Sequence, residues 1–201
     1  NVAIAGLAHI DAPIILTTDM INIELKETMQ RLGIKTDVLQ DIAGIKARRM
    51  WDDNLQASDV ATMAAEKALL DAGVDRSKIG LLVNTSVSRD FLEPSTASIV
   101  SGNLRLGDQC LNFDIANACL AFLNGMDVAG RMLERGEIDY ALIVDGETAN
   151  LAYKKTLEGI ATFFRGTSHH NSNICIDFTS DTQAEVRSVV LAIHRYTKER
   201  P

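Results

Sequence analysis

Residues 111–124 read LNFDIANACLAFLN, and this stretch decides the fold. The alternating residues from Leu111 to Asp114 predict a short strand, and a turn of small and polar residues follows at 115–118. Cys119 comes next, and apolar residues at helical spacing then predict a helix that ends before Gly136. A cysteine therefore lies where a buried strand ends and a buried helix begins.

This position gives the Cys119 thiol two interpretations. The first N–H groups of a helix have no intrahelical partner, and the helix dipole places partial positive charge there. A thiolate at such a point is stabilised and becomes a usable nucleophile near neutral pH. The alternative is a small buried thiol that fills a tight junction. Position alone favours this alternative, because unpaired cysteines are among the most buried residues.

The flanking sequence alternates strands with helices. Nearly continuous apolar runs at Ile79–Thr85 and Tyr140–Val144 predict strands that are covered on both faces, and Val2–Ala8 predicts a first strand. Helices are predicted between and around these strands, at residues 18–31, 37–43, 60–72, 95–104 and 120–135. This alternation predicts a layered α/β domain with helices on both faces of its sheet.

Composition excludes several classes of protein. The chain has 201 residues, of which 46% are hydrophobic and 23% charged, as in an ordinary globular protein. Its net charge is −7 and no Lys/Arg run stands out, which argues against nucleic-acid partners. No apolar run is long enough to span a bilayer. Cys110, Cys119 and Cys175 show no metal-ligand spacing, so we expect a cytoplasmic protein without a metal or cofactor.

Two further segments carry open questions. Residues 45–51 place three basic side chains beside the only tryptophan. They either contact a phosphate-bearing ligand or form an exposed segment paired with Asp52 and Asp53, and the residues support both interpretations equally.

After Gly159 the composition becomes irregular and polar, so we divide the chain into a domain at 1–159 and a tail at 160–201. Within the tail, a strand is predicted at 174–178 and a helix at 182–196.

Adjacent histidines, His169 and His170, lie in the polar part of the tail. Neighbouring side chains point apart in both strands and helices, so a surface loop is the better interpretation than a metal site.

Four segments together resemble a known family: GIKARR at 44–49, IGLLVNTSVSRDFLEPSTASIV at 79–100, FDIANACLAFLNGMDVA at 113–129 and RGEIDYALIVDGE at 135–147. Their order and spacing resemble the ketoacyl-ACP synthase III branch of the thiolase superfamily, and in particular its OleA-type acyl-CoA condensing enzymes. The resemblance covers Asn1–Glu158. It implies the first half of a layered αβαβα fold with a mixed, mostly parallel sheet, a homodimer, and a catalytic cysteine at Cys119.

The resemblance also implies an acyltransferase reaction of olefin biosynthesis. One long-chain acyl group passes from acyl-CoA to the cysteine, and the deprotonated α-carbon of a second acyl-CoA attacks this thioester. The product of this head-to-head Claisen condensation is a β-keto acid, formed without decarboxylation. Glu93 matches the glutamate that enters the site from the partner subunit as the base, and an apolar pocket would strengthen it. From the residues alone, Glu93 is a solvated loop residue that faces Arg89.

Some parts of the family pattern have no counterpart here. Nothing matches the later His and Asn that form the oxyanion hole with the cysteine. Val38 lies where CoA-using members carry Trp, so no CoA-binding residues are assigned.

Half of such a fold exposes apolar surface and tends to associate. Two alternatives therefore accompany the OleA-type enzyme: a non-catalytic half-fold that dimerises or binds a full-length condensing enzyme, and a decarboxylating ketoacyl-ACP synthase III. Glu93 argues against the second, because decarboxylation forms the carbanion without such a base.

Overall fold

The computed structural model describes residues 1–35, 40–41, 44–148 and 187–195, the last range by its backbone alone. The chain divides into two compact units. The first contains Asn1–Asp11, Asn54–Thr148 and the strand at Arg187–Arg195, and the second contains Ala12–Asp53. Of the helix predicted at 37–43, only residues 40–41 are described, and they are helical. The strand predicted at 174–178 and the pair His169–His170 lie outside the described residues.

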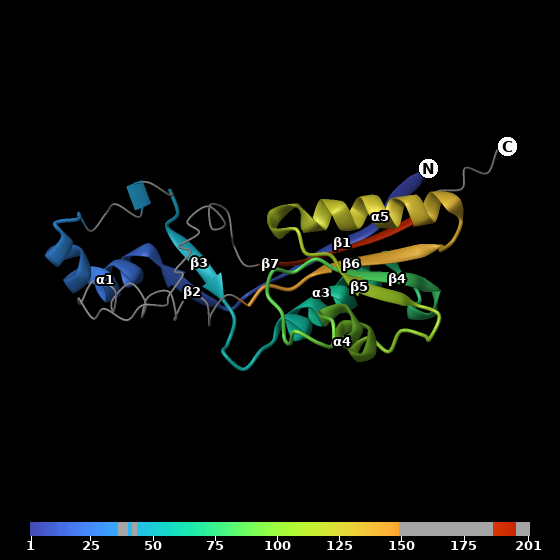
Figure 1. Cartoon of the computed structure of the whole chain (residues 1–201), viewed down its shortest axis with the longest axis horizontal. Coiled ribbons are helices and arrows are strands. Elements are labelled where there is room, and N and C mark those ends of the chain that lie inside the picture. The colour runs from blue at the N-terminus through green and yellow to red at the C-terminus, as the bar shows by residue number, and fades with distance from the viewer. Residues whose placement is uncertain (36–39, 42–43, 149–186, 196–201) are drawn as a thin grey trace. The chain divides into compact units, whose positions relative to one another are not determined.

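A five-stranded sheet forms the centre of the first unit, in the order β1-β7-β6-β4-β5 (Figure 1). β4 pairs in parallel with both of its neighbours, β5 and β6, while β7 runs antiparallel between β6 and β1. The predicted α/β class with a mixed, mostly parallel sheet is therefore confirmed. The strands are β1 (Val2–Asp11), β4 (Ile79–Asn84), β5 (Leu111–Asp114), β6 (Tyr140–Asp145) and β7 (Arg187–Arg195).

β7 corrects one prediction. The sequence predicts a helix at residues 182–196, because Val186, Val189, Val190 and Ile193 recur at helical spacing. The structure instead places Arg187–Arg195 in a strand that pairs with β1 on one side and β6 on the other. Pairing with strands far away in sequence overrides the local pattern, and a segment rich in β-branched residues suits a strand.

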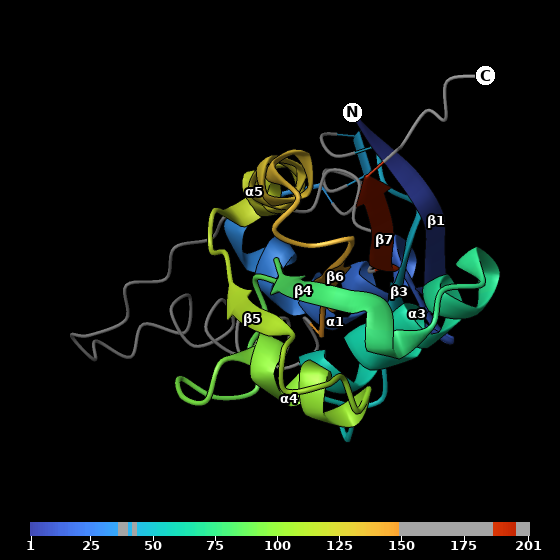
Figure 2. The same cartoon turned by 90° about the vertical axis from the view of Figure 1, so that its right-hand side faces the viewer.

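Helices cover both faces of this sheet (Figures 1 and 2). On one face lies α5 (Ala121–Arg135), which buries Ala129 and Leu133 against Leu81, Val83 and Ile143 of the strands. On the other face lie α3 (Ala57–Ala72) and α4 (Thr96–Asn103), which pack against Leu82, Leu142 and Val144. Successive residues of β4 thus point to opposite helical layers, which explains its continuous apolar sequence.

Small residues let α3 lie close to the sheet. Ala61, Ala64, Ala65 and Ala68 are completely buried along one side of this helix. A Cβ at Gly6 of β1 would come within 2.8 Å of the Ala72 Cβ, so only glycine fits at this contact. The alanine-rich helix predicted at 60–72 is confirmed, although it begins earlier, at Ala57, where Asp59 accepts a hydrogen bond from the Gln56 N–H.

The second unit contains α1 (Thr18–Leu32) and a pair of antiparallel strands, β2 (Ile14–Thr17) and β3 (Ala47–Met50). The helix has the predicted ends, since the Thr17 side chain accepts from the Met20 N–H and Gly33 adopts a left-handed conformation. The core of this unit consists of Leu16, Ile21, Leu25 and Met29, with Met50 packed against them.

The basic segment at residues 45–51 becomes β3 and its flanks. Arg49 donates a hydrogen bond from Nη1 to the Ala12 carbonyl at 3.0 Å, and Trp51 is buried. The two functional interpretations of this segment, phosphate contact and pairing with Asp52 and Asp53, stay predictions.

Candidate active site

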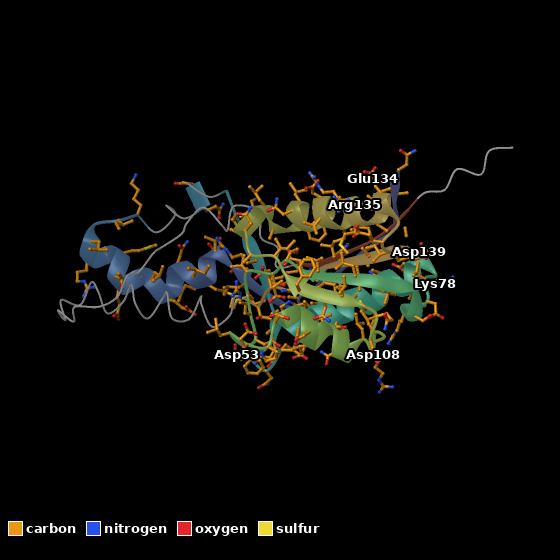
Figure 3. The ribbon with its side chains drawn as sticks, turned by 45° about the vertical axis from the view of Figure 1, so that its right-hand side comes forward. Asp53, Lys78, Asp108, Glu134, Arg135 and Asp139 are labelled. Atoms are coloured by element: carbon orange, nitrogen blue, oxygen red, sulfur yellow. The ribbon has the colours of Figure 1, made fainter. Side chains whose placement is uncertain are left out.

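The carboxyl ends of β4, β5 and β6 meet at one edge of the sheet, where α/β proteins commonly bind ligands. Backbone hydrogen bonds join these ends, from Thr85 N–H to the Val144 carbonyl and from Ile115 N–H to the Asn84 carbonyl. At the opposite edge, where the parallel strands begin, charged side chains such as Lys78 and Asp139 point outward (Figure 3). The site residues predicted from the sequence, Glu93 and Cys119, follow the carboxyl ends of β4 and β5.

Cys119 lies in a single 3₁₀ turn, Ala118–Leu120, between the end of β5 and the start of α5 at Ala121. The predicted strand–cysteine–helix order is therefore confirmed, with the α-helix beginning two residues after the cysteine. The Cys119 side chain is exposed. The interpretation of this residue as a buried filler of a tight junction is wrong, because the junction turns the thiol toward the surface.

The turn before Cys119 holds a strained residue. Ala118 has a φ of +42°, in the left-handed region where a Cβ atom crowds the backbone. Strained residues of this kind cluster at active sites, where the surrounding structure enforces them. Here the Leu120 N–H donates to the Asn117 carbonyl, and the Asn117 side chain donates to Asn124 Oδ1.

Glu93 lies in the loop that connects β4 to α4, and it is exposed. Its neighbours Phe91 and Leu92 are also exposed, with 59% and 85% of their surface accessible. The following helix begins at Thr96 with Ser95 as its N-cap, so Pro94 precedes the helix rather than starting it. No ion pair joins Glu93 to Arg89, and no hydrogen bond joins Glu93 to Cys119, among the described residues. The two predicted site residues thus follow neighbouring strands without a direct bond.

Buried polar groups fill the space where β4 and β6 end. Ser86 Oγ donates to Asn84 Oδ1 and accepts from the Gly146 N–H, each at 2.7 Å. Asp145 lies beside this pair. Burial, together with the nearby Glu147 carboxylate, raises the pKa of Asp145 to about 7. A second carboxyl group next to Asp145 therefore favours its neutral form.

Three carboxylates in this region have a role that the sequence did not reveal. Asp90, Asp114 and Glu147 each accept two or more hydrogen bonds, at least one of them from a backbone N–H, and the donors lie 17 to 60 residues away in the sequence. The one available signal was position, because Asp114 ends β5 and Glu147 closely follows β6.

The other cysteine of the described residues differs from Cys119 in its burial. Cys110 is buried, and burial raises the pKa of its thiol to about 11. Cys175 lies outside the described residues. Within the described ranges, no cluster of three or more His, Cys, Asp or Glu side chains is arranged to bind a metal ion. A search of the same residues finds no helix with the length and apolarity that crossing a membrane requires.

Comparison with known proteins assigns the fold to a class. Residues 113–164, which include the cysteine turn, match the family model of 3-oxoacyl-[acyl-carrier-protein] synthase III. The acyl-CoA:acyl-CoA alkyltransferase of Xanthomonas campestris is 73% identical over 158 residues, which are 79% of this chain and 47% of that protein. The Shewanella oneidensis protein of the same name is 34% identical over 161 residues, covering 80% and 46%.

Solved structures agree. A crystal structure of Xanthomonas campestris OleA with bound lauric acid and lauroyl-CoA, in which a cysteine is replaced by serine, superposes with a TM-score of 0.85. Sequence identity is 60%, and the match covers 97% of this chain and 56% of that one. These findings make the chain a member of the FabH/thiolase family. Within it the chain is OleA-like, and it spans about half the length of the curated relatives that it matches, their N-terminal half.

Proposed function

We propose that this chain belongs to an OleA-like enzyme that condenses two long-chain acyl-CoA molecules, with Cys119 as the nucleophile. The observation that carries this proposal is the exposed thiol on a strained turn at the carboxyl end of β5, in a chain 73% identical to an acyl-CoA:acyl-CoA alkyltransferase. Because its substrates are CoA thioesters, the enzyme is expected to work in the cytoplasm.

The first step is acyl transfer. The Cys119 thiolate attacks the thioester carbonyl of one acyl-CoA, the bond from that carbonyl to the CoA sulfur breaks, and CoA leaves as its thiolate. An acyl-cysteine results, which remains a reactive thioester. The exposure of the thiol supports this step, because the acyl carbonyl of a bulky CoA thioester has to reach the sulfur.

The second step forms the carbon–carbon bond. The Glu93 carboxylate removes a proton from the α-carbon of a second acyl-CoA, and the resulting carbanion attacks the acyl-cysteine and releases the thiolate. Hydrolysis of the remaining CoA thioester by water gives a β-keto acid and CoA. No carbon dioxide is lost, so the base has to supply the full driving force for carbanion formation.

The proposed enzyme is a homodimer in which Glu93 reaches the site of the partner subunit. The loop around Glu93 supports this arrangement, since Val87, Phe91 and Leu92 expose large apolar side chains that a subunit contact would cover. Exposed apolar residues on α5 and β5, including Leu111 and Leu123, extend the apolar surface of this unit.

Product analysis tests the reaction. The full chain is incubated with a long-chain acyl-CoA alone, and β-keto acid and free CoA are measured; Cys119→Ala and Glu93→Gln serve as inactive variants. Product from acyl-CoA alone supports the proposal. Turnover that requires a malonyl thioester and releases carbon dioxide would instead identify a decarboxylating synthase III.

A non-catalytic role is the second candidate, and the exposed apolar side chains of this unit favour it. In this role the chain dimerises or binds a full-length condensing enzyme through its exposed apolar surface. Size-exclusion chromatography with and without such an enzyme tests this. Complex formation without any β-keto acid supports the role, and a stable monomer that binds nothing contradicts it.

A further inference from the structure

The loop from Ser86 to Ser95 carries Glu93, and carboxylates fix it on both sides of its tip. Glu147, which follows β6, accepts from the Val87 N–H at 2.6 Å and from the Ser88 N–H at 3.1 Å, and the Ser88 hydroxyl donates to it at 2.6 Å. A single side chain thus takes up both backbone donors at the start of the loop.

Two more carboxylates fix the rest of this segment. Asp114, at the end of β5, accepts from the Thr96 N–H at 3.0 Å and the Ala97 N–H at 2.8 Å, in the first turn of α4. Asp90, within the loop, accepts from the backbone N–H and the hydroxyl of Ser58 in α3. Phe91–Pro94 lie between the attachments at Asp90 and Thr96, and all four residues are exposed.

We propose that Glu147 and Asp114 are positioning residues that fix the two ends of the Glu93 loop, so that Glu93 is held in the position from which it reaches the partner subunit's site. This inference rests on the proposed function for its catalytic meaning, and on the hydrogen bonds for its structural one. Asp114 ends the strand that leads to Cys119 and also binds the helix that follows Glu93. It therefore joins the strand before Cys119 to the loop whose Glu93 reaches the partner subunit's site.

The state of the neighbouring Asp145 supports the role of Glu147. Glu147 accepts three hydrogen bonds through its two carboxylate oxygens. Burial, followed by the Glu147 charge, raises the pKa of Asp145 to about 7, so Asp145 is the member of the pair that holds a proton below that pH. The two carboxyl groups can therefore lie side by side while Glu147 accepts the hydrogen bonds of the loop.

Hydrogen exchange tests the positioning directly in the full chain. In Glu147→Gln, we expect the Val87 and Ser88 amides to exchange about 10- to 100-fold faster, the factor that a lost hydrogen bond to a charged group produces. Asp114→Asn should speed amide exchange by a similar factor at Thr96 and Ala97 alone.

Glu137→Gln is the matched control, because Glu137 is an exposed glutamate that pairs with Arg135. It should change the exchange rate in neither region. Unchanged exchange in Glu147→Gln would overturn the proposal.

Ser88→Ala provides a second variant, in case Glu147→Gln does not fold. It removes the hydroxyl that donates to Glu147 and also accepts from the Thr148 N–H. We expect it to speed exchange at Val87 and Ser88 while circular dichroism stays unchanged. Exchange identical to the unaltered chain in this variant would count against the anchor.

A comparison of the two half-reactions separates positioning from general stability. Glu147→Gln should lose condensation by about 100-fold, as expected when a reacting group is misplaced by about 1 Å, and should still form the acyl adduct on Cys119. Loss of both steps together would contradict a positioning role. If the unaltered chain forms no adduct, the proposed function fails, whereas the exchange measurement still decides this inference.

Discussion

Asn117 donates a hydrogen bond from Nδ2 to Oδ1 of Asn124 at 2.7 Å, across the turn that carries Cys119. This bond joins the residue before the strained Ala118 to the second turn of α5. It is the side-chain contact that ties the two ends of the cysteine turn together. The position of the Cys119 side chain is therefore expected to depend on this hydrogen bond.

Removing either asparagine should slow acylation of Cys119. Asn117→Ala and Asn124→Ala are each expected to lower the rate several-fold, since a neutral hydrogen bond contributes about 1 kcal/mol. The double variant should be no slower than either single one, because both changes remove the same bond. Asp127→Ala, on the exposed side of α5, is the control. Additive effects in the double variant would show that the bond does not act as a unit.

The two described cysteines should differ in reactivity. Burial raises the pKa of Cys110 to about 11, so its thiol stays protonated and covered at neutral pH, whereas Cys119 is exposed. Iodoacetamide at about pH 7.5 should therefore alkylate Cys119 first, and Cys110 only after unfolding. Peptide mass mapping in a Cys175→Ser background measures this. Equal labelling of both residues in the folded chain would contradict the structure.

Asp145 should make stability depend on pH. Its pKa is about 7 in the fold and 3.8 as the ordinary value, so between these values the folded chain binds a proton that the unfolded chain has released. Stability contributed by this group therefore falls as pH rises from about 4 to about 7, and it levels off above that. Asp145→Asn removes this dependence. Urea unfolding should show the variant gaining relative to the unaltered chain as pH rises, and parallel pH profiles would disprove the assignment.

Two glycines on α5 provide a test of its packing. A Cβ at Gly125 would meet Thr85 Cγ2 at 3.1 Å and Ile143 Cγ2 at 3.2 Å, whereas nothing lies within 4 Å of a Cβ at Gly130. Gly130→Ala should stabilise the chain by roughly 1 kcal/mol, because alanine is the better helix former. Gly125→Ala should destabilise it, because both neighbours belong to the central β4–β6 region. Thermal unfolding of the two variants gives the comparison, and a stabilised Gly125→Ala would show that α5 packs less closely.

Local patterns explain why much of the fold could be predicted. The continuous apolar runs of β4 and β6 and the left-handed glycines at 33, 73 and 136 are properties of the sequence around them. β7 could not be predicted in this way. Its apolar spacing fits a helix, and only pairing with β1 and β6 decides the outcome.

The same distinction between local sequence patterns and long-range contacts applies to the residues of the candidate site. Cys119 and Glu93 are predicted as site residues from the motifs around them. The carboxylates at Asp114 and Glu147 were not, because their hydrogen-bond donors are backbone N–H groups that become neighbours only when the strands pair. Such contacts leave no periodic signal in the sequence.

The proposed reaction depends most on Cys119, the residue that accepts the acyl group. The full chain is incubated with a long-chain acyl-CoA, and its intact mass is measured before and after digestion. The predicted result is a mass gain of one acyl group that maps to Cys119, remains in Cys110→Ser and disappears in Cys119→Ala. A folded chain that gains no acyl group, or an adduct that persists in Cys119→Ala, would contradict the account.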